Sequence, residues 1–307
     1  MSTVKAKIPT RFHYRYDNLT AFVNEVKHVV DNKAFQPEYK ASPSGLVYDT
    51  SEGWHGTKDI NETFTMARFC WPKGRDKLVT ALASASKALE DRPTFTMDVA
   101  GAYPDVPLYI AGDPACMVDL APEDERKRPI VRLAINGSVS CAYGADKLTN
   151  YGAACLSYVD ALENAGYRVE LECLISCALN NSTSGKRYNL HVMAKQAHEH
   201  MDLDMLAFMF VQPSFFRRLV FCHMQSRTDL PKDSMSRCGT AASPVPGIDT
   251  DEGQLLIPGI NTFAPSSPAL ASPKAAADAL APILEKLLMD AGMRPPSLAF
   301  SQDSLKG

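Results

Sequence analysis

The chain has 307 residues, of which 45% are hydrophobic and 22% charged, and its formal net charge at pH 7 is −3. This length and composition are typical of a globular protein with one large domain or two modest ones. The slight negative charge argues against nucleic-acid binding driven by total charge, although it leaves room for a local basic face. The N-terminal residues lack the apolar core of a signal peptide. No apolar run reaches the roughly 18 residues of a membrane span, so we expect a cytoplasmic protein.

The first region that we expect is an α+β segment over residues 1–128, either a separate domain or packed on the main sheet. Its apolar spacing predicts helices over 19–31, 59–69 and 74–90, and Pro72 and Gly74 separate the last two. A strand and a turn-rich loop are expected over 94–120. The charged stretch 121–129 is expected to be a solvated connector.

The second region, 129–295, alternates strands and helices. Apolar runs predict strands over 129–140, 167–179, 185–196 and 253–263, and helices over 150–166, 202–225 (interrupted near Pro213) and 272–293. Asn150 is a candidate N-cap and Gly166 a candidate C-cap. This alternation predicts a doubly wound, mainly parallel α/β sheet. Residues 296–307 are expected to form a disordered tail.

The first of these strands ends in Asn136-Gly137-Ser138-Val139-Ser140. This stretch is one residue away from Asp-x-Ser-x-Ser, and with the helix and strand that follow, it resembles the start of a von Willebrand factor A (vWA) domain. The segments "WHGTKDINETFTMARFCWPKGRDKL" and "MDVAGAYPDVP" also resemble uncharacterised proteins of tailed bacteriophages. The resemblance implies a vWA-like α/β domain whose strand-end loops form a partner surface.

The vWA resemblance also implies a candidate metal site. In that family the Asp, both Ser, a Thr and a second Asp bind Mg²⁺ directly or through water. Ser138 and Ser140 match, Asn136 replaces the first Asp, and Thr240 is the candidate threonine. Asn lacks the negative charge that Mg²⁺ favours, so we expect a degenerate, metal-free site. Asn136, Ser138, Ser140 and Thr240 are then expected to line a partner-binding surface.

The pair His198 and His200 is a second candidate site, because two imidazoles this close can share a metal. A polar loop between strand and helix explains the pair equally well, with Asp202 as the cap of the next helix. In "WHGT", Thr57 or Asp59 is a candidate cap, and Trp54 is expected to pack on the core. The eight cysteines include no CxxC pair and are interpreted as reduced thiols.

The stretch "FFRRLVF" (215–221) combines aromatic and guanidinium groups. Phe215, Arg217 and Arg218 are candidate contacts for single-stranded nucleic acid, through stacking and phosphate binding. The alternative interpretation is an amphipathic helix whose apolar face packs inward and whose arginine pair is solvated.

These patterns support three functional hypotheses. The first is a non-enzymatic bacteriophage accessory protein in the host cytoplasm, with no cofactor, that uses the degenerate vWA-like module for protein–protein interaction. The second is a factor of phage replication or transcription that binds single-stranded nucleic acid and recruits a polymerase. The third is a hydrolase centred on His198 and His200, which would need a bound transition metal.

Overall fold

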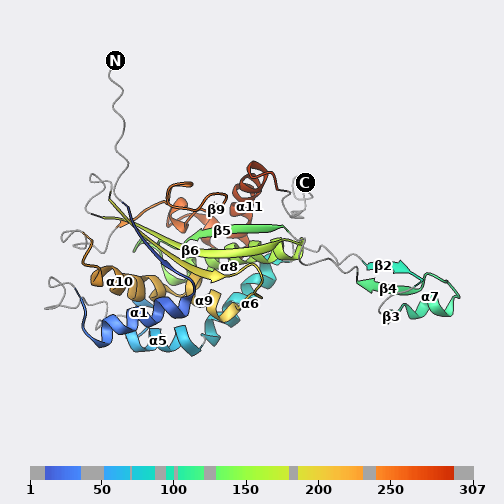
Figure 1. The fold of residues 1–307 in the computed structure, drawn as a ribbon, viewed down its shortest axis with the longest axis horizontal. Helices are drawn as coiled ribbons and strands as arrows, with labels where there is room; N and C mark the ends of the chain where they lie inside the picture. Colours follow the sequence, from blue (N-terminus) through green and yellow to red (C-terminus); the bar gives the residue numbers. More distant parts are fainter. Residues whose placement is uncertain are drawn as a thin grey trace, which may run out of the picture.

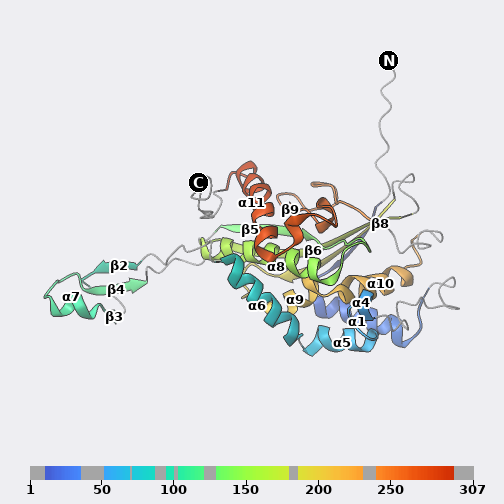
Figure 2. The ribbon, with the colours of Figure 1, turned by 180° about the vertical axis from the view of Figure 1, so that it is seen from behind.

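The computed structural model describes residues 11–35, 52–69, 71–86, 95–99, 103–120, 129–179, 186–230 and 240–293. They form a main α/β body and a small second sheet (Figures 1 and 2). The predicted tail, 296–307, and nearly all of the connector 121–129 lie outside the described residues. The main elements are β1 (Arg11–Tyr16), α1 (Leu19–Asp31), α4 (Glu52–His55), α5 (Ile60–Phe69), α6 (Pro72–Ser86), β5 (Ile130–Asn136), α8 (Ala145–Asn164), β6 (Arg168–Ala178), β7 (Arg187–Lys195), α9 (Leu203–Val211), η2 (Phe215–Val220), α10 (Phe221–Ser226), β8 (Thr240–Ala241), β9 (Leu255–Ile257), η4 (Ile260–Thr262), η5 (Pro268–Leu270) and α11 (Pro273–Asp290).

The main sheet has the strand order β1-β7-β6-β5-β9, and β8 pairs with the end of β6. Along this order the pairs β1–β7, β6–β5 and β5–β9 are parallel, whereas β6 and β7 are antiparallel. The prediction of an α/β fold with a mostly parallel sheet is therefore confirmed. The unit β5–α8–β6 is the parallel crossover that the apolar runs indicated.

Local signals account for most helix boundaries. Asn18 caps α1, which spans the predicted residues, and Ser272 caps α11 ahead of Pro273. Gly166 follows α8 with a φ of 87°, which suits glycine after a helix end. The prediction of Asn150 as an N-cap was wrong. The helix starts five residues earlier, at Ala145, and the Asn150 side chain donates a hydrogen bond to the Leu270 carbonyl.

The helices that contact the main sheet gather on one face, whereas the sequence predicted a doubly wound sheet. On that face, Tyr188 of β7 is hydrogen-bonded to His223 of α10, and Tyr16 of β1 packs edge-on against Phe22 of α1. Helices α1, α5, α9 and α10 run along this side of the sheet (Figure 1). Within the described ranges, the opposite face carries polar side chains such as His191, which contact other strands and the segment 242–254 instead of a helix.

The N-terminal region supplies part of the main body. β1 is the edge strand of the main sheet, in parallel register with β7 from Arg11↔Arg187 to Tyr16↔Val192. Phe22 and Val26 of α1 are fully buried in the same core as the strands β5 and β6. The sheet and its core therefore draw on residues from both sides of the predicted boundary at 128/129.

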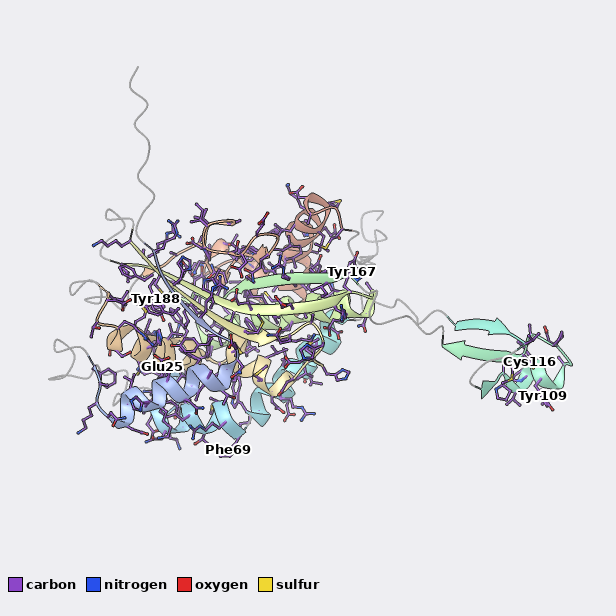
Figure 3. The ribbon with its side chains drawn as sticks, viewed as in Figure 1. Glu25, Phe69, Tyr109, Cys116, Tyr167 and Tyr188 are labelled. Atoms are coloured by element: carbon purple, nitrogen blue, oxygen red, sulfur yellow. The ribbon has the colours of Figure 1, made fainter. Side chains whose placement is uncertain are left out.

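A small sheet interrupts the chain between α6 and β5. Its strands β2 (Phe95–Asp98), β3 (Tyr103–Pro104) and β4 (Met117–Leu120) pair antiparallel in the order β2-β4-β3, and α7 (Val106–Ile110) lies between β3 and β4. Figure 3 shows Tyr109 and Cys116 on this unit and Tyr188 on the main body. The sequence predicted β2, but it missed α7, which Asp105 caps by accepting a hydrogen bond from the Leu108 amide.

No single helix in the described ranges is long and apolar enough to cross a membrane. The bent pair formed by α9 and residues Phe215–Ser226 reaches that length and composition jointly. Most of its side chains are buried in the core of the main body, which explains its apolar composition.

Candidate functional site at the strand ends

The stretch Asn136–Ser140 begins at the last residue of β5, at the edge of the sheet where the parallel neighbour β9 also ends. Asn136 Oδ1 accepts a hydrogen bond from the Ser138 amide at 3.0 Å, and Ser138 Oγ accepts one from the Ser176 amide at 2.6 Å. Asn261 joins the two loops, because its Oδ1 accepts from the Ser140 amide at 3.1 Å and its Nδ2 donates to the Ser138 carbonyl at 2.7 Å. The sequence motif is therefore part of a closed hydrogen-bond network.

These residues do not fit a Mg²⁺ site. The side-chain oxygens of Asn136, Ser138 and Asn261 each accept a backbone N–H, so these lone pairs are directed at donors. None of the three is a carboxylate, the ligand type that Mg²⁺ sites usually include. The carboxylate of Asp249 is engaged elsewhere on the sheet, by Arg11 and Asn189. Backbone amides therefore fill the role that a cation would have in holding the two loops together.

Two of the predicted partner-binding residues are buried, which corrects the proposal that they form an exposed surface. Asn136 is 3% exposed and Ser138 is fully buried, whereas Ser140 is half-buried. Thr240 lies in β8, opposite Ala178 near the end of β6, and its side chain falls outside the described residues. The structure thus brings Asn136, Ser138 and Ser140 together with Asn261. The main role of these four residues is to hold the loop after β5 in one conformation.

A crevice opens beside this loop and is the main candidate for binding. It has a volume of about 30 Å³ and lies between the end of β5, the first half of α8 and the break between α9 and η2. Its wall is largely apolar and includes Ile135, Val139, Leu148, Tyr151, Phe210 and Phe216. Ligands of open α/β sheets bind at the carboxyl ends of the strands, which is where this crevice lies.

The predicted nucleic-acid contacts are buried, and this corrects both interpretations of "FFRRLVF". Phe215 is 1%, Arg217 3% and Arg218 0% exposed, in the six-residue π-helix η2. Arg218 donates to the hydroxyl and carbonyl oxygens of Thr57 at 2.8 Å. The arginine pair fastens η2 to the segment around α4, so it neither faces solvent nor is available to a phosphate backbone.

Arg217 makes a different set of contacts. It donates to the Trp54 carbonyl at 2.6 Å and to the Tyr143 carbonyl at 2.9 Å, and its guanidinium lies 4.9 Å from the centre of the Trp54 ring. Burial lowers the pKa of Arg217. Arg217 also lines the crevice, which makes it the only charged residue among those that form its described wall.

The other sequence candidates occupy ordinary structural positions. His198 and His200 are exposed in a turn before α9, and Asp202 caps that helix as predicted. Asp59 accepts from the Glu62 amide at 2.8 Å at the start of α5, so the capping role predicted for it is confirmed. Across the described ranges, no group of three or more His, Cys, Asp or Glu side chains is arranged to hold a metal ion.

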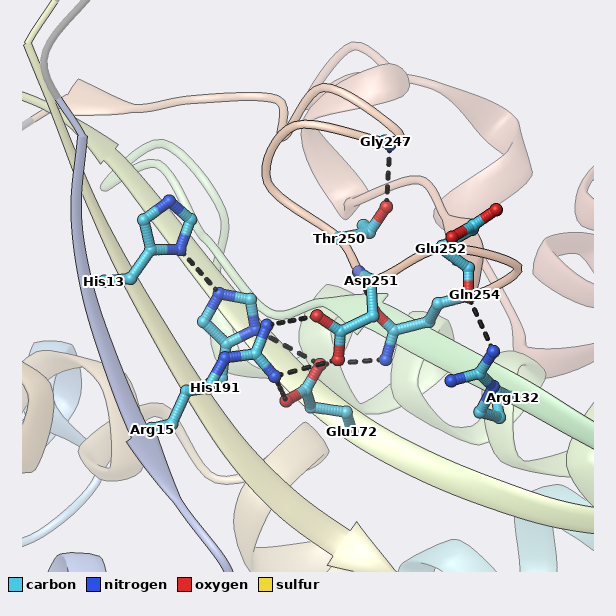
Figure 4. Close-up of polar contacts among 10 residues, drawn as sticks. All are labelled: His13, Arg15, Arg132, Glu172, His191, Gly247, Thr250, Asp251, Glu252 and Gln254. Carbon is cyan, nitrogen blue, oxygen red and sulfur yellow. Dashed lines mark hydrogen bonds and ion pairs between the residues drawn. The ribbon is translucent and has the colours of Figure 1, made fainter.

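The polar face of the main sheet carries a second cluster, which Figure 4 shows in close-up. His191 Nδ1 lies 3.2 Å from Glu172 Oε2, and His191 Nε2 lies 3.2 Å from His13 Nδ1. Gln254 Nε2 donates to Glu172 at 2.9 Å. Arg15 binds both carboxylate oxygens of Asp251, at 2.6 and 2.9 Å. The cluster joins strands β1, β6 and β7 to the segment that precedes β9.

The electrostatics of this cluster keep Glu172 ionised. Burial alone would raise the pKa of Glu172, but the hydrogen bonds from His191 and Gln254 outweigh burial and hold the pKa below its ordinary value. Since an ionised carboxylate only accepts, His191 Nδ1 carries the proton. Within the described part of the chain, neither His13 nor His191 is hydrogen-bonded to a Ser, Thr or Cys side chain. The arrangement therefore lacks the nucleophile that a catalytic dyad would activate.

Sequence reasoning missed this cluster because its members are far apart in the chain. The signal was present in the first strand, where Arg11, His13 and Arg15 alternate with Phe12, Tyr14 and Tyr16. Such alternation predicts a strand with one polar and one apolar face. The Arg217 contacts had no comparable signal, because burial of a charged residue depends on the tertiary packing around it.

Comparison with known proteins places the chain in one family. Residues 3–290 match the model of a family described as a domain of unknown function, DUF7192, and the chain belongs to that family. No curated protein matches the chain. No solved structure matches it either.

Proposed function

We propose that this chain is a non-enzymatic accessory protein of a tailed bacteriophage that acts in the host cytoplasm through protein–protein contact. In this proposal the main body is a vWA-like module whose metal site has degenerated, and the partner binds at the strand ends. The observation that supports it is the combination of two features at one sheet edge. The loop oxygens are satisfied by amides, and an apolar crevice lies beside them.

The physical argument is that the network and the crevice have separate roles. Buried polar groups that are all hydrogen-bonded hold a loop in one conformation, so the crevice wall is preorganised. An apolar recess at an edge of the sheet gains free energy when a partner covers it. Val139 is half-buried on the wall, so a change there alters the crevice without disturbing the network below.

We expect Val139→Arg to abolish capture of the partner, because it places a charge where apolar surface must be covered. The full chain is immobilised and exposed to lysate of phage-infected cells. The captured protein is then purified, and its affinity for the unmodified chain and for each variant is measured directly. The matched control is Ile130→Arg, because Ile130 is exposed at the start of β5, at the opposite end from the loop that holds Val139. Equal affinity of the two variants for the captured protein would contradict the proposal.

Single-stranded nucleic-acid binding remains an alternative without named contacts. Phe215, Arg217 and Arg218 were the residues proposed for it, and all are engaged inside the main body. A basic surface elsewhere would have to bind the nucleic acid. The polar sheet face does not provide free arginines at Arg11, Arg15 and Arg187, because these are paired with Asp249 or Asp251.

A further inference from the structure

Apart from Tyr151, whose hydroxyl donates to the Pro258 carbonyl, every polar side chain on the described wall of the crevice offers N–H donors. These side chains are Asn136, Gln212 and Arg217, and no carboxylate lines the wall. Gln212 Nε2 has the thioether sulfur of Met66 as its hydrogen-bond acceptor, at 3.3 Å, and a thioether is a weak acceptor. Asn136 Nδ2 reaches the Ala242 carbonyl at a long 3.4 Å. The wall therefore offers donors with weak partners to whatever enters the crevice.

Arg217 adds a buried positive charge that no described carboxylate pairs with. It is 3% exposed, and its two hydrogen bonds go to neutral carbonyl oxygens, of Trp54 and Tyr143. Among the described residues, no Asp or Glu lies within ion-pair distance of it. Two of its five N–H groups are used by those carbonyls. A buried charge is costly unless it is paired, so this arginine favours an anion beside it.

The geometry points to a binding site for a small carboxylate. We infer that the carboxylate of a short apolar acid lies against Arg217 while its stem contacts Ile135 and Phe216. A guanidinium and a carboxylate match in shape and charge. The cavity of about 30 Å³ has room for two or three water-sized groups, which limits the buried part to a carboxylate and a short stem. The π-helix that holds Arg217 agrees with this, because such turns occur often at functional sites.

This inference goes beyond the proposed partner contact, because it concerns the purified chain alone. The test is an NMR chemical-shift titration of the full chain with propionate and with propionamide, its neutral counterpart of the same shape. We expect propionate to bind with a Kd of about a millimolar, as befits a ligand of so few atoms. Propionamide is expected to bind about tenfold more weakly or worse, because it lacks the charge. Equal affinities, or no saturable binding of propionate, would overturn the inference.

Substitutions at Val139 and Ile130 locate the site without changing Arg217, and substitutions of Arg217 test the role of its charge. Val139→Trp is expected to fill the crevice and remove propionate binding, whereas Ile130→Trp, at the other end of β5, should leave it unchanged. Arg217→Lys keeps the positive charge and should keep weak binding, and Arg217→Gln should lose it. If Arg217→Gln fails to fold, the comparison of Val139→Trp with Ile130→Trp still shows whether propionate binds in the crevice. Propionate binding that survives in Val139→Trp would place the site elsewhere and overturn the inference.

The carboxylate can belong to a free small molecule or to an acidic side chain of a partner. Excess propionate in the capture experiment distinguishes the two sources. Displacement of the captured protein would assign the carboxylate to the partner, and undiminished capture would assign it to a free acid. Because the titration needs no partner, a failed capture with normal propionate binding would count against the proposed function only.

Discussion

His223 of α10 lies at the centre of a buried hydrogen-bond network on the helical face of the sheet. Tyr188 Oη lies 2.6 Å from its Nδ1 and Tyr16 Oη 2.7 Å from its Nε2, and Arg227 Nε donates to Nε2 at 3.0 Å. Because arginine offers only donors, Nε2 is an acceptor and Nδ1 carries the proton. Glu25, labelled with Tyr188 in Figure 3, forms the ion pair with Arg227 that completes the network.

The chemistry of this network predicts a pH-dependent stability. Burial, followed by the nearby Arg227 charge, holds the pKa of His223 well below 6.5, so the folded state keeps it neutral. In the unfolded chain it gains a proton near pH 6.5. The folded state then binds fewer protons, so this contribution to stability is fully present above about pH 6.5 and declines as the pH falls below it. His13, whose pKa is also lowered, first by burial and then by His191, acts in the same direction.

We therefore expect the free energy of unfolding to fall between pH 7.5 and 5.5, and to fall less steeply in His223→Gln. Each such histidine contributes a slope of up to about 1.4 kcal/mol per pH unit. The measurement is urea unfolding at several pH values in this range. His198→Gln, at an exposed turn, controls for the substitution itself. An unchanged slope in His223→Gln would show that this histidine is not the group responsible.

At the scale of elements, the close approach of α8 and α9 depends on one glycine. A Cβ atom at Gly152 would lie 2.6 Å from the Phe210 carbonyl oxygen and 3.0 Å from Val211 Cγ2. The first of these is backbone, so it cannot move aside as a side-chain end would. Gly152 thus allows the two helices to pack at a distance that also sets the width of the crevice.

Gly152→Ala is expected to destabilise the protein by about 1–3 kcal/mol, because the helices must separate. The gain in helix propensity from alanine, roughly 0.4–1 kcal/mol, offsets only part of that cost. Gly53→Ala in α4 is the matched control, since a Cβ there meets nothing within 4 Å. Urea unfolding measures both variants. A Gly152→Ala protein as stable as Gly53→Ala would show that the helices are not held this closely.

The sequence predicts those elements that are determined by residues close together in the chain. The helix α1 and the unit β5–α8–β6 follow from apolar spacing and from end signals such as Asn18 and Gly166. The sequence did not predict that helices cover only one face of the sheet, because β5 and β6 are nearly continuous apolar runs, which are typical of strands buried on both faces. In the structure Arg132 and Glu172 point to the polar face within those runs, and each is hydrogen-bonded to a residue of the segment 242–254.

The candidate site was predictable only in part, for a related reason. The strand-end motif drew attention to Asn136 and Ser138, which do lie at an edge with a crevice. Whether those side chains face a cation or backbone amides depends on Ser176 and Asn261, which are distant in sequence. The role of Arg217 depends in the same way on Trp54 and Tyr143.

At the scale of the whole molecule, the hydrophobic core is discontinuous in sequence. Its described members come from 19–35, 60–78 and 131–288, and none is among the side chains of the small sheet that the structure describes. The N-terminal strand and helix therefore belong to the main body energetically, whereas no described side chain of the small sheet between α6 and β5 contributes to this core. On α7 the side chains of Val106, Tyr109 and Ile110 are exposed.

This arrangement predicts that the small sheet is removable and that β1 is not. Replacing residues 91–126 by a flexible Gly/Ser linker is expected to change the free energy of unfolding by less than about 1 kcal/mol, because none of the described side chains in this range belongs to the core. Deleting residues 1–16 is expected to prevent cooperative folding, since it exposes the edge of β7 and uncovers buried residues such as Phe22 and Tyr188. Circular dichroism and urea unfolding of both deletions provide the measurement. Loss of cooperative unfolding in the first deletion would mean that the small sheet packs on the main body, and a stable second deletion would mean that β1 is only peripheral.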